Sequence, residues 1–206
     1  MPALLDLRSR TSAFQLSTFR FSSISSCNPK SKILFSSSSP PLSTGQRVNQ
    51  QVKPTIYIET TVVSYLTARP TRDVIVMARQ QITMAWWKTQ LPRFKPMISQ
   101  LVLEEAARGN SEAASRRLNA LKDFPLVDAT SSAFTLAARF IRAGGLPAKA
   151  KDDALHLALC AVHGLSYLLT WNFRHLANAE IRSFLSGVCA KAGYILPIIC
   201  TPDELP

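Results

Sequence analysis

Short apolar strands alternate with helices from residue 55 onward, and this alternation constrains the fold more than any other feature. Runs rich in β-branched, aliphatic and aromatic residues predict strands at residues 55–58, 97–99, 125–127, 167–170 and 198–199. Apolar residues at helical spacing predict helices at residues 60–66, 74–89, 101–107, 111–121, 131–143, 152–162 and around 181–185. We therefore expect an α/β/α sandwich around a central parallel sheet.

Residues 1–53 have a different composition from the rest of the chain. They hold thirteen serines, seven Lys or Arg residues and a single acid, Asp6. A serine-rich, basic and acid-poor segment is typical of an organelle transit peptide, and such a segment buries too little apolar surface to offset the entropy of ordering. We expect a disordered transit-peptide-like segment over 1–53, addressed to a chloroplast or alternatively a mitochondrion, and one domain over 54–206. A tail without an address stays open.

Composition argues against several classes of protein. No window of about 18 residues is apolar and free of charge, so a membrane span is not expected. The four cysteines, Cys27, Cys160, Cys189 and Cys200, lie far apart without a CxxC pair, which argues against a zinc ribbon or a disulfide framework. The glycine-rich loops that bind nucleotide phosphates are absent. Residues 54–206 carry seventeen Lys or Arg residues and twelve acids, and this net charge of +5 is compatible with a polyanionic partner and equally with a solvated basic surface.

Three acidic residues lie where apolar surface would make a lone carboxylate costly. Glu59 ends the first predicted strand, Glu105 lies in the helix after the second, and Asp153 opens the apolar helix at 152–162. Such groups need pairing, hydrogen bonds or a cation, and ligands of parallel sheets bind beyond the carboxyl ends of the strands. An all-oxygen set suits Mg²⁺ or Mn²⁺. The alternative is that Asp153 only stabilises its helix and that Glu105 is exposed.

Four segments resemble the motifs of the PIN domain family. Residues 57–66 (YIETTVVSYL) resemble its first strand and helix, and residues 105–109 (EAARG), after Ile98-Ser99, resemble its second-acid motif. Residues 153–158 (DALHLA) resemble its third-acid helix, and residues 168–176 (LLTWNFRHL) resemble the strand and turn of its fourth position. The segments follow the family's order, and the resemblance is closest to the bacterial toxin-type (VapC-like) branch.

This resemblance implies a PIN-like α/β/α sandwich and a divalent-metal-dependent ribonuclease. It implies that Glu59, Glu105 and Asp153 are the catalytic metal ligands, with Asn172 as an outer or water-mediated ligand and Mg²⁺ or Mn²⁺ as the cofactor. The expected partner is RNA, while a homodimer stays open and no antitoxin is visible in one chain. The residues expected to bind the substrate are Thr60, Lys149, Lys151 and His175.

Two departures from the family pattern keep a second function open. The first acid is Glu59, where the family usually has Asp, and the fourth position is the neutral Asn172. A site with fewer acids holds Mg²⁺ more weakly. The alternative is therefore a catalytically inactive PIN-fold module for RNA binding or assembly, and a third is a toxin-like protein controlled by an inhibitory partner.

His156 and one residue of the tryptophan pair are expected to be structural, whereas His175 stays a candidate for substrate binding. The histidines are not assigned to a zinc site, because Cys160, which lies near His156 and His163 in the sequence, has no second pair of Cys or His ligands beside it. His156 is expected to be a satisfied core histidine, because it lies on an apolar helix. One residue of the pair Trp86-Trp87 is expected in the core.

Overall fold

The structure is a computed structural model that describes residues 52–205. The predicted transit-peptide-like segment, residues 1–53, lies almost wholly outside the described residues, and so does Cys27. None of the described helices is long and apolar enough to cross a membrane.

A five-stranded, all-parallel sheet forms the centre of the domain. Its order is β3-β2-β1-β4-β5, so the first strand in sequence is the middle strand of the sheet. Tyr57 of β1 pairs with Met97 of β2 on one side and with Leu168 of β4 on the other. The strands are β1 (Thr55–Ile58), β2 (Lys95–Ser99), β3 (Leu126–Val127), β4 (Tyr167–Leu169) and β5 (Ile198–Cys200).

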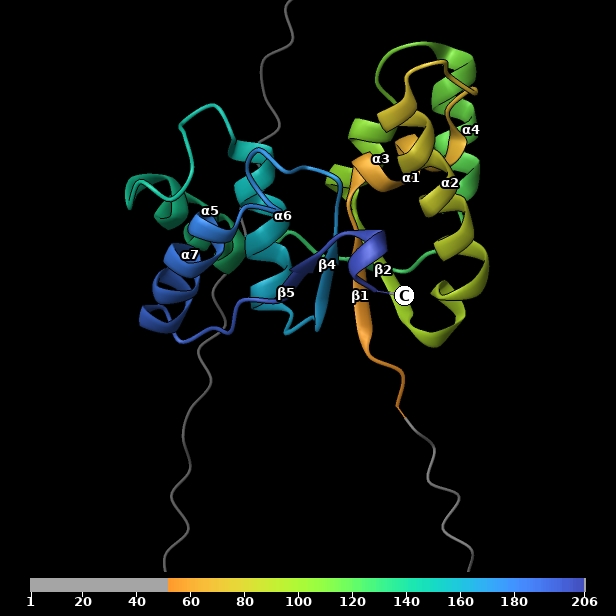
Figure 1. Cartoon of the computed structure of the whole chain (residues 1–206). Helices are drawn as coiled ribbons and strands as arrows, with labels where there is room; N and C mark the ends of the chain where they lie inside the picture. Colours follow the sequence, from red (N-terminus) through yellow and green to blue (C-terminus); the bar gives the residue numbers. More distant parts are fainter. Residues whose placement is uncertain (1–51, 206) are drawn as a thin grey trace, which may run out of the picture. The chain divides into compact units, whose positions relative to one another are not determined.

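Helices cover both faces of this sheet. Figure 1 shows α5, α6 and α7 together on one side and α1, α2, α3 and α4 on the other, which makes three layers. The fold is therefore the α/β sandwich that the alternation of strands and helices predicts. The helices are α1 (Thr60–Thr67), α2 (Val74–Thr89), α3 (Gln100–Ala106), α4 (Ser111–Leu121), α5 (Ser131–Arg142), α6 (Lys151–Val162) and α7 (Ala179–Lys191), and two short 3₁₀ turns are η1 (Leu91–Arg93) and η2 (Pro202–Glu204).

Capping side chains set where several helices begin. Asp73 accepts a hydrogen bond from the Val76 N–H at 2.9 Å, and Asn110 accepts one from Ala113 at 3.1 Å, so each side chain satisfies an end-of-helix donor. At the far end of α5, Gly144 has a φ of +82°, a conformation that glycine adopts without strain. The sequence predicts these boundaries to within a residue or two.

The first helix begins differently from the sequence-based expectation. Thr60 or Thr61 is expected to cap α1, but the N-cap is Glu59, whose carboxylate accepts from the Thr61 N–H at 3.1 Å. Thr60 and Thr61 are the first two helical residues instead. The end of β1 and the start of α1 therefore meet at an acidic residue.

Burial is deepest around β1 and α6, which lie next to the site. Ile56, Tyr57 and Ile58 have no exposed surface, as expected for a middle strand covered on both faces. Helix α6 is buried along most of its length, as its apolar sequence predicts. Of the pair on α2, Trp86 is buried and Trp87 half-buried. The three described cysteines, Cys160, Cys189 and Cys200, are free and buried.

Candidate metal centre

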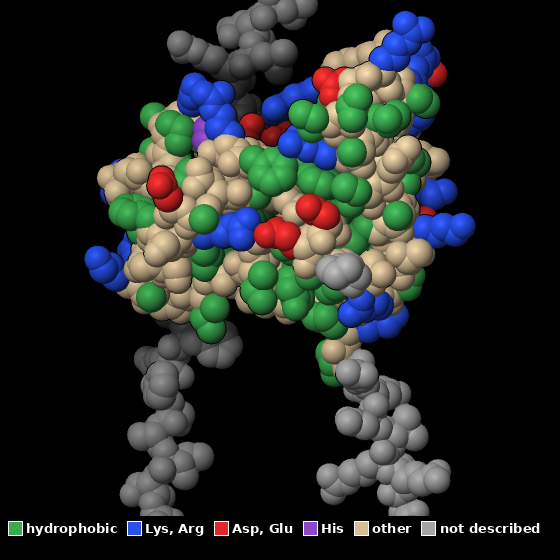
Figure 2. All heavy atoms as spheres, in the orientation of Figure 1, with side chains coloured by type: hydrophobic (Ala, Val, Ile, Leu, Met, Phe, Trp, Pro, Cys, Tyr) green, Lys and Arg blue, Asp and Glu red, His purple; other side chains and the backbone are tan. Residues whose placement is uncertain are grey.

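A cleft of about 430 Å³ lies at the carboxyl edge of β1 and β4. It brings together all three predicted acids, although they come from the end of β1, from α3 and from α6. Figure 2 shows acidic side chains set between the upper ends of α6 and α3, with Lys and Arg side chains nearby. The cleft is lined by Glu59, Thr60, Thr61, Ser64, Tyr65, Glu105, Arg108, Asp153 and Asn172.

Glu59 is fixed at the bottom of the cleft by threonine donors. Its side chain is only 4% exposed. The Thr61 N–H and hydroxyl and the Thr170 hydroxyl (2.8 Å) all donate to Oε2. Within residues 52–205 no hydrogen bond reaches Oε1, so this oxygen is free for a ligand. Burial raises the pKa of the Glu59 carboxyl above its ordinary value, although the charge of His156 and the threonine hydrogen bonds act against it.

Glu105 faces Glu59 from the last turn of α3. Its Oε2 accepts a hydrogen bond from the Thr60 hydroxyl and lies 3.1 Å from Nε2 of His156. Its Oε1 accepts no hydrogen bond from any described residue. Burial acts to raise the pKa of the Glu105 carboxyl, but the hydrogen bond and charge of His156, together with Thr60 and Arg108, outweigh it and hold the pKa below its ordinary value.

His156 completes this group, and the sequence analysis did not assign it there. Its ring is 1% exposed, with Nε2 next to Glu105 and Nδ1 2.8 Å from the Tyr57 hydroxyl, which in turn lies 2.6 Å from Ser99 Oγ. Burial acts to lower the pKa of His156, but Glu105 and the other nearby carboxylates raise it overall. The expectation of a buried and satisfied histidine is confirmed, yet the ring also contacts the acids. The sequence did contain one signal of this position: His156 lies three residues after Asp153 in one helix, and residues at that spacing share a face of the helix.

We call Glu59, Glu105 and His156 the buried cluster. One ligand atom from each lies within 4.8 Å of the others, so the three could hold a metal ion. Two carboxylates that close, with little water around them, repel each other, and a bound cation removes that repulsion. Each glutamate also keeps an oxygen without a hydrogen bond. The residues therefore fit a divalent cation in both geometry and donor chemistry.

Asp153 belongs to a second group, the Asp153 cluster, formed with Asn172 and His175. Its Oδ1 accepts from Asn172 Nδ2 at 2.9 Å, and its Oδ2 lies 2.8 Å from His175 Nδ1. The side-chain oxygen of Asn172, Oδ1, accepts from the His175 backbone N–H at 3.2 Å, which closes the group into a ring. In this arrangement Asn172 orients Asp153, and its amide oxygen already has a partner.

The predicted RNA-contacting residues have mixed positions. His175 touches Asp153, and the Thr60 hydroxyl donates to Glu105 rather than standing free for a phosphate. Among the described residues Lys149 and Lys151 are exposed and do not line the cleft. The cation that lines it is Arg108, which sequence reasoning missed and which lies 3.6 Å from the exposed Asp152.

The sequence matches no protein-family model, and no curated protein matches it significantly.

Proposed function

We propose that this protein is a divalent-metal-dependent ribonuclease of the PIN type that acts in an organelle, with the chloroplast as the first choice on the composition of residues 1–53. The observation that carries the activity is the meeting of Glu59, Glu105 and Asp153 in one cleft at the carboxyl edge of a parallel sheet. An acidic cleft needs a cation before it can accept a phosphodiester, because the phosphate is itself an anion.

In this proposal the buried cluster holds the ion through Glu59, Glu105 and His156. When bound, a divalent cation supplies Lewis-acid chemistry to phosphodiester hydrolysis, since it polarises the phosphate and acidifies water. Two carboxylates and an imidazole favour Mn²⁺ over Mg²⁺, because an imidazole ligand suits transition metals better than Mg²⁺. The Tyr57 hydroxyl, against Nδ1, orients the ring so that Nε2 faces the acids.

The remaining cleft residues act on the substrate side. Asp153, 19% exposed and held by Asn172 and His175, offers a negatively charged acceptor for a proton of the attacking water. Thr60 positions Glu105 through its hydroxyl. Arg108 is the lining residue with a positive charge, so it takes the phosphate-contacting role that sequence proximity assigned to Lys149 and Lys151.

The proposal is tested by incubating the full chain with labelled single-stranded RNA in Mn²⁺, in Mg²⁺ and in EDTA. We expect cleavage with Mn²⁺, weaker cleavage with Mg²⁺ and none in EDTA. Glu105→Gln should abolish cleavage. Glu104→Gln is the matched control, since Glu104 is its exposed neighbour on α3 and the substitution removes the same charge. Equal cleavage by Glu105→Gln and Glu104→Gln would overturn the proposal.

A catalytically inactive RNA-binding module is the second candidate. Asn172 favours it, because its amide is engaged by Asp153 and by the His175 N–H and adds no charge to the cleft. RNA binding by the wild-type chain, with no cleavage in Mn²⁺ or Mg²⁺, is the outcome that selects this candidate.

A further inference from the structure

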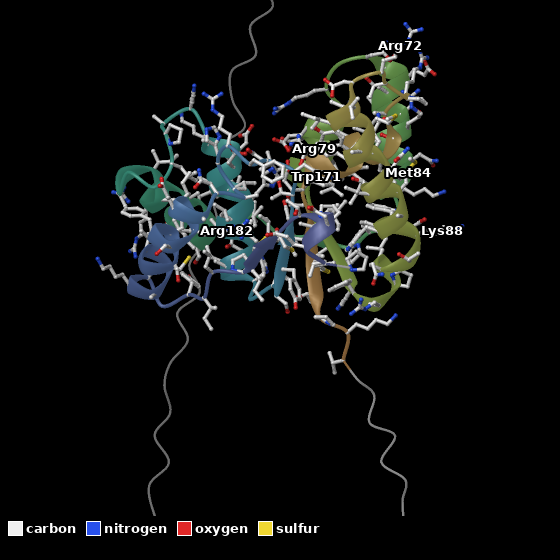
Figure 3. All side chains as sticks on the ribbon, in the orientation of Figure 1. Arg72, Arg79, Met84, Lys88, Trp171 and Arg182 are labelled. Atoms are coloured by element: carbon white, nitrogen blue, oxygen red, sulfur yellow. The ribbon has the colours of Figure 1, made fainter. Side chains whose placement is uncertain are left out.

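An arginine surrounded by three aromatic rings lies beside the cleft. The guanidinium carbon of Arg79 is 4.8 Å from the ring centroid of Phe173, 5.5 Å from that of Trp171 and 5.9 Å from that of Tyr65. Figure 3 shows Arg79, from α2, next to Trp171, from the turn after β4. Arg79 also donates a hydrogen bond to the Tyr65 hydroxyl at 3.1 Å. We call these four residues the aromatic platform.

The aromatic platform is held in place and adjoins the candidate metal centre. Trp171 is buried, its indole N–H donates to Thr83 at 2.8 Å, and its backbone N–H donates to the Thr61 hydroxyl at 2.8 Å. Thr61 is also a donor to Glu59. Tyr65 lines the cleft, and Phe173 directly follows Asn172, another lining residue. A ligand that leaves the cleft on this side therefore meets the platform.

Two groups of the platform have unused binding capacity. Phe173 is 45% exposed, so part of its ring is open to solvent. Arg79 forms no ion pair with any residue in the described part of the chain, and one of its N–H groups donates to Tyr65. An exposed ring face and an unpaired guanidinium, next to a cleft for a phosphodiester, match the two parts of a nucleotide: a flat base and an anionic phosphate.

We propose that Phe173 and Arg79 form a subsite for one nucleotide of single-stranded RNA, with the base stacked on Phe173 and the adjacent phosphate against Arg79. The inference rests on the proposed function in taking RNA as the ligand. Aromatic rings and arginine are the side chains that proteins use for unpaired bases, and stacking of this kind tolerates any base. The subsite would hold the strand so that its next phosphate enters the cleft.

The role of the Phe173 ring is tested by measuring RNA binding under conditions in which no metal-dependent cleavage occurs. Fluorescence anisotropy of labelled adenylate and uridylate oligonucleotides is measured with the full chain in EDTA. Phe173→Ser should weaken binding about tenfold, because one stacked base contributes on the order of 1.4 kcal/mol. The matched control is Phe184→Ser on α7, where the ring is 46% exposed and away from the cleft. Phe173→Trp should retain or tighten binding, and Phe173→Ser should weaken binding of both oligonucleotides, because stacking tolerates any base.

The role of the Arg79 guanidinium is tested with a control substitution on the same helix, α2. Arg79→Met keeps most of the side-chain stem and removes the charge, and Lys88→Met removes one charge from an exposed position of α2 (Figure 3). Only Arg79→Met should weaken binding severalfold and reduce the slope of log affinity against log salt by about one. A purely structural role of Arg79 would lower thermal stability and leave this slope unchanged.

The outcomes separate this inference from the proposed function. Equal affinities for Phe173→Ser and Phe184→Ser, or no RNA binding by the wild type, overturn the subsite. Weaker RNA binding by Phe173→Ser, with unchanged binding by Phe184→Ser, supports the subsite. This holds even where the wild type does not cleave RNA and the ribonuclease proposal is rejected. Metal-dependent cleavage that is indifferent to Phe173 leaves the ribonuclease and removes the subsite.

Discussion

The buried cluster and the Asp153 cluster lie in the same cleft and satisfy their carboxylates in opposite ways. In the buried cluster the hydrogen bonds to Glu59 and to Glu105 all go to one oxygen of each carboxylate. In the Asp153 cluster each carboxylate oxygen has its own partner, Asn172 or His175. The first group keeps one oxygen of each glutamate without a hydrogen bond from a described residue, whereas both oxygens of Asp153 have partners. The difference indicates which half of the cleft could hold a cation.

The largest expected effect concerns the metal itself. At Mn²⁺ a hundredfold above its Kd, binding to the folded state should add about 2.7 kcal/mol to the free energy of unfolding, which corresponds to a rise in Tm of about 5–10 °C. Glu105→Gln should remove this rise completely, and Asp153→Asn should keep most of it. Thermal melts with Mn²⁺ and with EDTA measure both. A rise that is lost in Asp153→Asn and kept in Glu105→Gln would reverse the assignment of the two clusters.

The next effect is on stability without metal. His156→Ala removes one of two hydrogen-bond partners from Glu105 and from the Tyr57 hydroxyl and opens a buried cavity, so it should lower the free energy of unfolding by about 2 kcal/mol. His175→Ala removes a partly exposed ring, 16% exposed, and should cost about 1 kcal/mol or less. Urea unfolding in EDTA compares the two. Equal losses of stability in His156→Ala and His175→Ala would show that the buried cluster and the Asp153 cluster do not differ in what their histidines contribute to stability.

A smaller effect is expected from the threonines that hold Glu59. Thr170→Val keeps the shape of a fully buried side chain and removes the hydroxyl that donates to Glu59, so we expect a loss of about 1–2 kcal/mol. Mn²⁺ affinity should fall as well, since Glu59 loses a bond that orients it. Thr89→Val on α2 is the control, because its exposed hydroxyl donates only to the Ala85 carbonyl. Urea unfolding and Mn²⁺ titration measure the two variants.

The smallest effect tests the neutral fourth position. Asn172→Asp replaces an amide that donates to Asp153 with a second carboxylate, so it should destabilise the metal-free fold by about 0.5–1 kcal/mol through like-charge repulsion. The same substitution should tighten Mn²⁺ binding severalfold, because it adds a charged donor to the cleft. Melts in EDTA and a calorimetric Mn²⁺ titration check the two signs. A variant that is more stable in EDTA would contradict the arrangement of the Asp153 cluster.

The sequence predicts the fold well because its strands and helices have strong local signals. Asp73 before α2 and Gly144 after α5 mark boundaries that the structure confirms. The predicted N-cap of α1, Thr60 or Thr61, was wrong. Thr is a common capping residue and Glu is not, but Glu59 is the residue that lies between the end of β1 and the first turn of α1. Local preference for a capping residue does not reveal that the Glu59 carboxylate accepts the hydrogen bond from the Thr61 N–H.

The site was predictable in its acids and not in its surroundings. Glu59, Glu105 and Asp153 stand out because carboxylates are rare in apolar segments. His156 was assigned to the core alone because α6 is apolar nearly all round, which hides the side that faces the acids. Lys149 and Lys151 were chosen for their nearness in sequence to Asp153, but Arg108 and Arg79 reach the region from other elements, and only the tertiary fold brings them there.

The hydrogen bond from Thr170 to Glu59 joins residues that are 111 positions apart. The middle strand acquires its β4 neighbour late, after almost the whole domain has been synthesised, and contacts that close such long loops form slowly. An incomplete chain on the ribosome thus carries Glu59 and Glu105 without the threonine that holds Glu59 in place. Assembly of the cleft is therefore coupled to completion of the fold, and a nascent chain that ends before β4 cannot hold Glu59 as the complete domain does.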